Sequence, residues 1–289
     1  MTTIARAVLA GLAVLFAGNL AWGLALAPLN LRLWPAVPWA IVPMAAYLWV
    51  YWRFIGGRLG SGEAAAWRRE QLRAKPVGGD VWPLALMSGL AGFAALLTFV
   101  TVMARLVPLP TPAAIIAPAG MPRSTVIVLL VMASVVAGVT EEAAFRGYMQ
   151  SPIERRCGLS AAILINGVMF GLLHFPNHPA ETLTMLPYYV AVAAVYSGVT
   201  WAADSILPAL VLHAGGDVWS LTRLWATGRP EWQLADQRPL IWETGLDVSI
   251  VGSFLILVVL SAATCWLCIV TARTRRGRLV WGPPSGQPS

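Results

Sequence analysis

Long apolar runs separated by short polar segments recur along almost the whole chain. Most runs are close to the ~20 residues that an α-helix needs to cross the hydrocarbon core of a bilayer. The pattern predicts eight membrane-crossing helices, at about residues 5–27, 33–54, 82–107, 124–148, 160–175, 183–203, 205–224 and 247–271. We therefore expect an all-α, polytopic membrane helix bundle, with residues 1–272 as one membrane domain and 273–289 as a disordered cytoplasmic tail.

The polar segment between the second and third predicted helices, residues 55–80, is rich in arginine. We expect an amphipathic surface helix at about 63–75. If this segment is cytoplasmic, the alternation of helices places 14 of the 20 Lys and Arg residues on the cytoplasmic side. The positive-inside rule favours that orientation, with both termini in the cytoplasm. The first run is interpreted as a retained helix, because Pro28 would directly follow the cut of a signal peptide.

The composition agrees with a membrane protein, since 58% of the residues are hydrophobic and only 11% are charged. A soluble domain carries roughly 25% charged residues. The net charge of +7 does not gather in one stripe, so we expect contact with membrane lipids and no nucleic-acid binding. Cys265 and Cys268 are interpreted as packing or lipid-facing residues. The Ala- and Arg-rich composition is typical of bacteria with GC-rich genomes, which predicts the bacterial inner membrane.

Three ionisable residues lie together in the fourth predicted helix. Glu142 and Arg146 are four residues apart and therefore share a helix face, on which they can form an ion pair. Glu141 points about 100° away from Glu142. It is thus free to act as a general base, while Glu142 and Arg146 are structural. The alternative is a structural ion pair at a helix end, with Glu141 reaching the surface.

Two further helices carry histidines among polar or aromatic residues. Asn166, Phe170 and His174 form a stripe with a spacing of four, in which Asn166 and Phe170 are expected to support His174. His213 and Asp217 share a face of the seventh helix, and the small residues 214–216 would allow a close approach. Either histidine could also be a packed residue without a chemical role.

His178, in contrast, falls in a loop and is interpreted as solvated. Two chemistries fit the remaining residues. In the first, Glu141 and His174 activate a water molecule, and His213 with Asp217 stabilises the oxyanion of a peptide carbonyl.

In the second chemistry, Glu141, His174 and His213 bind Zn²⁺, which lowers the pKa of the attacking water. The sequence lacks an H-E-x-x-H motif, and the cofactor therefore stays open between none and zinc. An ionised Asp217 cannot donate a hydrogen bond to an oxyanion, so it would orient His213 or stay protonated.

The ordered set Glu141-Glu142-x-x-x-Arg146, Phe170-x-x-x-His174 and His213-x-x-x-Asp217 resembles the CPBP family of CAAX-processing and bacteriocin-processing intramembrane endopeptidases. The resemblance covers roughly residues 124–224. It implies an eight-helix core, a cavity open toward the cytoplasm, Glu141 as the catalytic glutamate, and a peptide or protein substrate that can be membrane-anchored. The family often has Asn at the position of Asp217. A prenylated tail is not expected as substrate in a bacterium.

Two other functions remain as alternatives: a non-catalytic membrane immunity or scaffold protein, and a transporter with a Glu/His/Asp relay. The active-site hypothesis also carries a geometric condition. His174 lies about 21 Å along its helix from the cytoplasmic start, whereas Glu141 lies near the cytoplasmic end of its own helix. The fifth helix must therefore be tilted, broken or begin outside the membrane if the two side chains are to meet.

Overall fold

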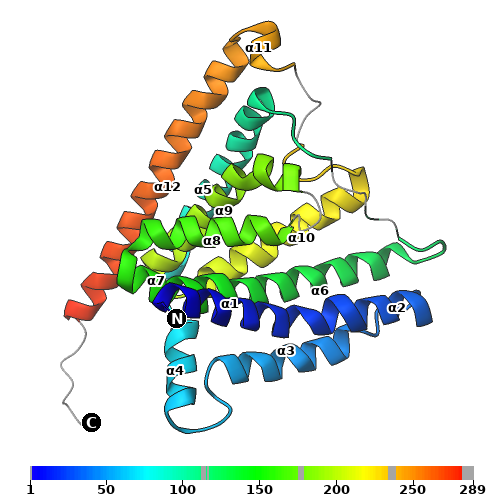
Figure 1. Ribbon diagram of the computed structural model, residues 1–289, viewed down its shortest axis with the longest axis vertical. Helices are drawn as coiled ribbons and strands as arrows, with labels where there is room; N and C mark the ends of the chain where they lie inside the picture. The colour runs from blue at the N-terminus through cyan, green and yellow to red at the C-terminus, as the bar shows by residue number, and fades with distance from the viewer. Residues whose placement is uncertain (1, 112–114, 116, 175–178, 234–238, 282–289) are drawn as a thin grey trace.

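The computed structural model describes residues 2–111, 115, 117–174, 179–233 and 239–281. These residues form helices joined by short connections, and none of them lies in a β-strand. The prediction of an all-α bundle is confirmed. The helices are arranged as a fan, with α12 running diagonally along one edge and α1, α3 and α6 lying side by side across the other (Figure 1).

The elements follow one another as α1 (Thr3–Leu20), η1 (Ala21–Leu26), α2 (Ala27–Leu33), α3 (Ile41–Ile55), α4 (Gly62–Leu72), α5 (Val81–Leu106), α6 (Arg123–Glu141), η2 (Glu142–Met149), α7 (Gln150–Cys157), α8 (Leu159–His174), α9 (Pro179–Ala203), α10 (Leu207–Thr227), α11 (Ile241–Thr244) and α12 (Val248–Trp281). The two η elements are π-helical. They continue the preceding α-helices without a break, so α1–η1–α2 and α6–η2–α7 are two long continuous helices.

Five helical segments of the described chain are long and apolar enough to cross a membrane, namely Thr3–Leu33, Val81–Leu106, Arg123–Cys157, Ala180–Ala203 and Val248–Gly277. Two shorter apolar helices, α3 and α8, have 15 and 16 residues. The 21-residue α10 is more polar, because it carries His213, Asp217 and Arg223. These eight segments correspond to the eight crossing helices that the apolar runs predict.

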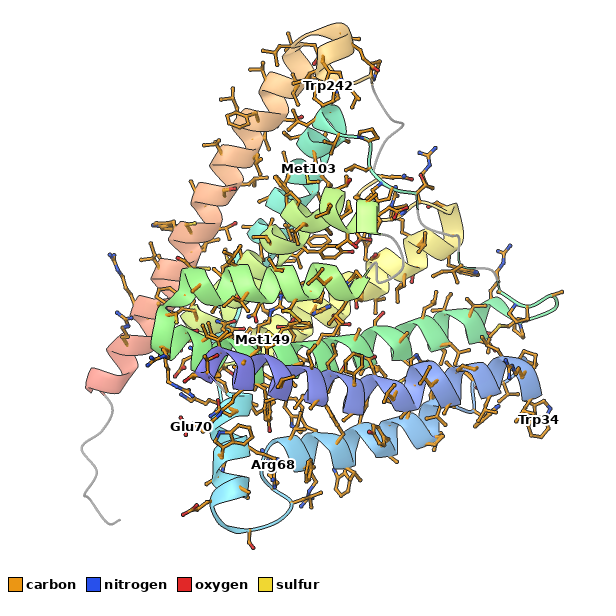
Figure 2. All side chains as sticks on the ribbon, viewed as in Figure 1. Trp34, Arg68, Glu70, Met103, Met149 and Trp242 are labelled. Carbon is orange, nitrogen blue, oxygen red and sulfur yellow. The ribbon has the colours of Figure 1, made fainter. Side chains whose placement is uncertain are left out.

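The crossing helices alternate in direction between two ends of the bundle. One end holds the N-terminus, α4, the α7–α8 turn, the α9–α10 turn and the end of α12, and we call it the α4 end (Figure 1). The other end holds the α2–α3, α5–α6 and α8–α9 connections and α11, and we call it the α11 end. Arg68 and Glu70 mark α4, and Trp34 and Trp242 lie far from them (Figure 2). The start of α1 and the end of α12 thus lie on the same side as the arginine-rich segment.

A network of ion pairs closes the α4 end around Asp204. Its carboxylate lies 2.9 Å from Arg73, 2.7 Å from Lys75 and 3.4 Å from Arg275. Arg73 also pairs with Glu154 at 2.9 Å. Burial alone would raise the pKa of Asp204, but the hydrogen bond from Lys75 and the Arg73 charge outweigh it, so its pKa is lowered. The predicted surface helix is present as α4. Directly after it, Arg73 and Lys75 form ion pairs with Asp204 in the α9–α10 turn.

The fourth crossing helix is longer than the sequence predicts. This extra length satisfies the geometric condition that Glu141 and His174 must be able to meet. It continues beyond residue 148 through α7 to Cys157, and Gly158 then turns the chain with φ = 84°. α7 and α8 pack as the two arms of this helical hairpin. Glu141 and His174 lie 17 and 16 residues from Gly158, which places them at similar heights on the two arms.

The C-terminal helix also extends further than predicted. α12 continues to Trp281, so the first part of the expected disordered tail, 273–289, is helical. Arg275 explains the extension in part, because its side chain donates to the carbonyl of Ala202 at 3.1 Å and pairs with Asp204. Much of α12 faces outward, as a helix in contact with lipid would, with Phe254, Val259 and Trp266 each more than half exposed.

Candidate active site

The site is built around η2, the π-helical segment that begins directly after Glu141. All eight residues of η2 are buried. Asn166 of α8 donates from Nδ2 to the carbonyl of Phe145 at 3.0 Å. The side chain of Asn166 thus supports η2 from the neighbouring helix, and short π-helical segments inside α-helices occur frequently at functional sites. The apolar pattern of the sequence contains no signal for this change of helix type.

His213 of α10 is held by a carboxylate of η2. Its Nδ1 lies 2.7 Å from Glu142 Oε1. An ionised carboxylate only accepts hydrogen bonds, so Nδ1 carries a proton and donates it to Glu142. Glu142 is also ion-paired with Arg146 at 3.3 Å, and both side chains are fully buried. The arginine thus compensates the buried negative charge that orients His213.

The Arg146 guanidinium is enclosed by aromatic rings. The centroids of Tyr196, Phe170 and Phe145 lie 5.2, 5.6 and 5.8 Å from its Cζ. Such ring faces stabilise a buried cation. The predicted pairing of Glu142 with Arg146 is confirmed, and the rings show how the cation is kept away from water.

The other ring nitrogen of His213 points to the remaining carboxylates. Glu141 and Asp217 each have an oxygen 3.6 Å from Nε2. This distance is longer than a hydrogen bond and leaves both oxygens within the reach of a small rearrangement or a bridging water. The His213 ring stacks on Tyr196 with a centroid distance of 5.0 Å and an interplanar angle of 10°. His213 is therefore fixed in orientation, with Nε2 directed at Glu141 and Asp217.

His174 is oriented by the carbonyl one turn before it. Its Nδ1 lies 2.8 Å from the Phe170 carbonyl oxygen, which can only accept. Nδ1 therefore carries the proton, and Nε2 is free to accept a hydrogen bond in the neutral ring. The ring packs between Phe170 and Tyr189, with centroid distances of 4.4 and 4.6 Å. Phe170 thus supports His174 through both its backbone and its ring.

Two close helix contacts bring these elements together. A Cβ atom added at Gly138 of α6 would lie 2.9 Å from the Ala214 Cβ and 3.0 Å from its backbone nitrogen. The small residues beside His213 thus serve a close approach, as expected, and Ala214 makes it. The space around Gly215 is open, with no neighbouring atom within 4 Å of such a Cβ. Gly138 therefore sets the distance between the helices that carry Glu141 and His213.

A cavity of about 260 Å³ joins the four candidate residues. Glu141, His174, His213 and Asp217 all line it. The lining continues along α10 through Ser220 and Leu224 and then to the segment Pro230–Trp232. Glu231 accepts hydrogen bonds from Ser220 and, at 3.4 Å, from the Tyr188 hydroxyl. Apart from Ser220 and Glu231, the remaining wall of the cavity is aromatic and apolar.

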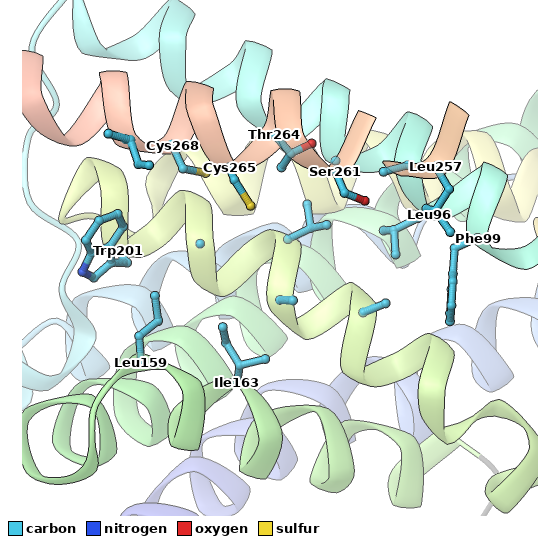
Figure 3. Close-up of a pocket in the computed structure, with 17 residues that line it drawn as sticks. Leu96, Phe99, Leu159, Ile163, Trp201, Leu257, Ser261, Thr264, Cys265 and Cys268 are labelled. Carbon is cyan, nitrogen blue, oxygen red and sulfur yellow. The ribbon is translucent and has the colours of Figure 1, made fainter. Parts of the chain in front are cut away.

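A second, larger pocket of about 540 Å³ lies between α5, α8, α9 and α12 (Figure 3). Its wall is made of apolar and small residues such as Leu96, Ile163 and Leu257, with Ser261 and Thr264 as its hydroxyl groups. Cys265 and Cys268 also line it as free thiols, which agrees with their expected packing role. None of its lining residues is a carboxylate or a histidine, so acid–base chemistry belongs to the smaller cavity.

Glu142 has a contact that the sequence pattern did not predict. It was expected to pair with Arg146, and it does so, but it also binds Nδ1 of His213. Asp217 is expected either to orient His213 or to stay protonated, and its carboxylate stands 3.6 Å from Nε2, on the other side of the ring from Glu142. The spacing of four indicated that Asp217 and His213 are neighbours on one helix. The contact of His213 with Glu142 joins two helices and depends on their packing, which the spacing does not encode. His178 lies outside the described residues.

The zinc alternative can be compared with the placement of its proposed ligands, Glu141, His174 and His213. Among the described residues, no group of three or more His, Cys, Asp or Glu side chains is arranged so that it could hold a metal ion. The Nδ1 atoms of both histidines are engaged in hydrogen bonds with Phe170 and Glu142, as they commonly are in zinc-binding histidines, so Nε2 of each ring would be the ligand atom. As placed, Glu141, His174 and His213 do not gather around a common point.

Fold and site together define a polytopic helical membrane protein with a buried carboxylate–histidine centre. Residues 123–219 match the family model described as Rce1-like, type II CAAX prenyl endopeptidase Rce1-like. The matched segment begins with α6, ends within α10 and includes all four candidate residues. The resemblance expected from the three motifs is thus confirmed for about a third of the chain, and this segment is similar to Rce1-like domains. No curated protein and no solved structure gave a match.

Proposed function

We propose that the protein is an intramembrane endopeptidase that hydrolyses a peptide bond with a water molecule activated by Glu141 and His174. The observation that carries the proposal is the orientation of the two histidines. Phe170 directs Nε2 of His174 away from its own helix, and Glu142 directs Nε2 of His213 at Glu141. The Rce1-like match of residues 123–219 supports a peptidase of this type.

In the proposed reaction, Glu141 is the general base. Water binds between the Glu141 carboxylate and Nε2 of His174, and one of its protons passes to Glu141 as its oxygen bonds to the carbonyl carbon. The carbonyl π electrons move onto the oxygen and form a tetrahedral oxyanion. When this intermediate collapses, the C–N bond breaks, and the proton held by Glu141 passes to the leaving amine. The products are a new carboxylic acid, which ionises by releasing its proton, and a new amine.

His213 is the electrostatic partner of the oxyanion. Its Nδ1 proton is committed to Glu142, so Nε2 donates to the oxyanion only when the ring carries both protons. In the doubly protonated state, the His213 ring presents its Nε2–H group to Glu141 and Asp217, whose oxygens both lie 3.6 Å from Nε2. A preorganised donor of this kind contributes roughly 100- to 1000-fold to the rate. No step of this mechanism passes through a metal ion.

The substrate class follows from the size and wall of the cavity. A volume of about 260 Å³ is below the roughly 300–1,000 Å³ of pockets that enclose drug-sized ligands. Only a short extended stretch of a chain fits, between rings such as Tyr188, Trp219 and Trp232. We therefore assign as substrate a membrane protein or membrane-anchored peptide that presents an unfolded segment, cleaved in a bacterial inner membrane.

Comparison of membrane peptides from cells tests the proposal. Cells with the wild-type protein, with Glu141→Gln and with Gly252→Ala are compared by mass spectrometry of their membrane fraction. The added methyl of Gly252→Ala meets no atom within 4 Å, so it serves as the matched control. We expect a set of cleavage products in wild type and control cells that is missing with Glu141→Gln. Identical peptides in all three would overturn the peptidase assignment and favour a non-catalytic immunity or scaffold protein.

Proton- or ion-coupled flux in liposomes that depends on Glu141 would favour the transporter instead. Transport and cleavage can be distinguished because ion flux yields no covalent product, whereas hydrolysis does.

A further inference from the structure

The cavity and the arginine-rich segment lie at opposite ends of the bundle. The cavity wall reaches Leu224 near the end of α10 and then Pro230–Trp232. Trp232 donates from its indole nitrogen to the Pro110 carbonyl at 2.8 Å, in the α5–α6 connection. All of these residues belong to the α11 end. The α4 segment belongs to the other end, with the ion-pair network of Asp204.

The site is closed toward the α4 end. On the way from His213 toward the α4 end, the ion pair of Glu142 with Arg146 is fully buried. One turn further along the helix, Gln150 is fully buried and donates to the Ser197 carbonyl at 3.2 Å and to Glu154 at 2.9 Å. Glu154 in turn pairs with Arg73. Buried polar side chains, from the Glu142–Arg146 pair through Gln150 to the Glu154–Arg73 pair, therefore occupy the interior between the cavity and the arginine-rich end.

With this arrangement of cavity and arginine-rich segment, two expectations from the sequence exclude each other. The positive-inside rule favours a cytoplasmic α4 end, since 14 of the 20 Lys and Arg residues belong to that side of the sequence. One of the 14, Arg146, is buried beside the site. The others still outnumber the six on the opposite side by about two to one. The family resemblance, in contrast, implies a cavity open toward the cytoplasm. Both expectations cannot hold for this chain.

We infer that the cavity opens to the extracytoplasmic side and that the substrate is a polypeptide segment presented at the outer face of the membrane. The inference rests on the proposed peptidase function only where it calls the bound segment a substrate. The side to which the cavity opens is inferred from charge distribution and topology alone. A prenylated cytoplasmic tail would meet the closed, arginine-rich end. A segment that emerges from the outer leaflet would meet Trp219, Trp232 and Glu231 at the cavity wall.

Labelling of single cysteines from one side of the membrane tests the inference. The background removes the native thiols with Cys157→Ser, Cys265→Ala and Cys268→Ala. Ala226→Cys reports the α11 end and Ala64→Cys reports α4, and both alanines are exposed. Spheroplasts are treated with a membrane-impermeant maleimide before and after permeabilisation. We expect Cys at 226 to react in intact spheroplasts and Cys at 64 only after permeabilisation.

The opposite pattern, or labelling of both positions in intact spheroplasts, would overturn the inference. Because labelling requires no catalysis, a peptidase proposal that fails leaves this result readable. A second measurement uses the membrane peptides that depend on Glu141. We expect their cleavage sites to fall in extracytoplasmic segments of the parent proteins, whereas cleavage sites in cytoplasmic segments would contradict the inference while leaving the peptidase assignment intact.

Discussion

His213 Nδ1 lies 2.7 Å from Glu142 Oε1, although 71 residues separate the two in the chain. This contact joins α10 to η2 and decides which nitrogen of His213 faces Glu141. In Glu142→Gln the orienting charge is lost, so we predict a fall in kcat on the order of 100-fold with little change in KM. The measurement is steady-state cleavage by the purified protein in lipid nanodiscs.

Glu142→Gln also leaves Arg146 as an unpaired buried cation, at a cost of about 3–5 kcal/mol in stability. The double variant Glu142→Gln/Arg146→Met removes that charge and serves as the control. We expect the double variant to regain much of its melting temperature while its kcat stays low. Recovery of activity along with stability would show that Glu142 only compensates Arg146 and does not position His213.

Gly138 is predicted to be intolerant of even one added methyl group. A Cβ there would lie 2.9–3.1 Å from three atoms of Ala214, two of them backbone atoms. In Gly138→Ala the helices must separate, which moves His213 away from Glu141. We expect a loss of about 1–3 kcal/mol in stability and at least a tenfold loss of cleavage. Gly252→Ala is the matched control, because its methyl meets open space. Equal behaviour of both variants would contradict the packing role.

The ion-pair network at the α4 end predicts a defined pH dependence. The pKa of Asp204 is lowered in the folded protein, so its contribution to stability is present above its unfolded pKa of about 3.9 and is lost as pH falls through the lower folded value. We expect Asp204→Asn to be less stable than wild type by about 1–2 kcal/mol at neutral pH. The gap between their melting temperatures should narrow below pH ~3.9. A constant gap down to pH 2 would be the contrary result.

Metal chelation separates the two chemistries that the sequence leaves open. Since the ligand set Glu141, His174 and His213 does not gather as a metal site among the described residues, we predict that 1,10-phenanthroline changes the cleavage rate by less than about twofold. The rate is measured on protein that was incubated with chelator for hours. Inactivation that added Zn²⁺ reverses would contradict the metal-free mechanism.

Much of the architecture could be predicted from hydropathy, because helix length in a bilayer depends on local composition. All eight crossing helices and the surface helix α4 are present, although the first continues to Leu33 and the second begins only at Ile41. The helix of Glu141 was predicted to end near residue 148, but it continues to Cys157. Its last turns carry Glu154, Arg155 and Arg156, which pair or lie at the α4 end, so hydropathy alone could not mark the true end.

The site was predicted only in part, for a physical reason. Periodicity identified Glu141, His174, His213 and Asp217, and all four line one cavity. The π-helical turn at Glu142, its bond to His213 and the end to which the cavity opens all depend on contacts between distant segments. A spacing of four shows which residues share a face of one helix and does not show what packs against that face.

The central claim is that the Glu141 carboxylate activates the attacking water. Its most direct test is kcat/KM of purified wild-type protein and Glu141→Gln, with a peptide identified as its substrate in cells. Gln has nearly the same shape and cannot take the proton, so we predict a loss of at least 100-fold with an unchanged melting temperature. A folded Glu141→Gln protein that cleaves within about threefold of the wild-type rate would contradict the mechanism.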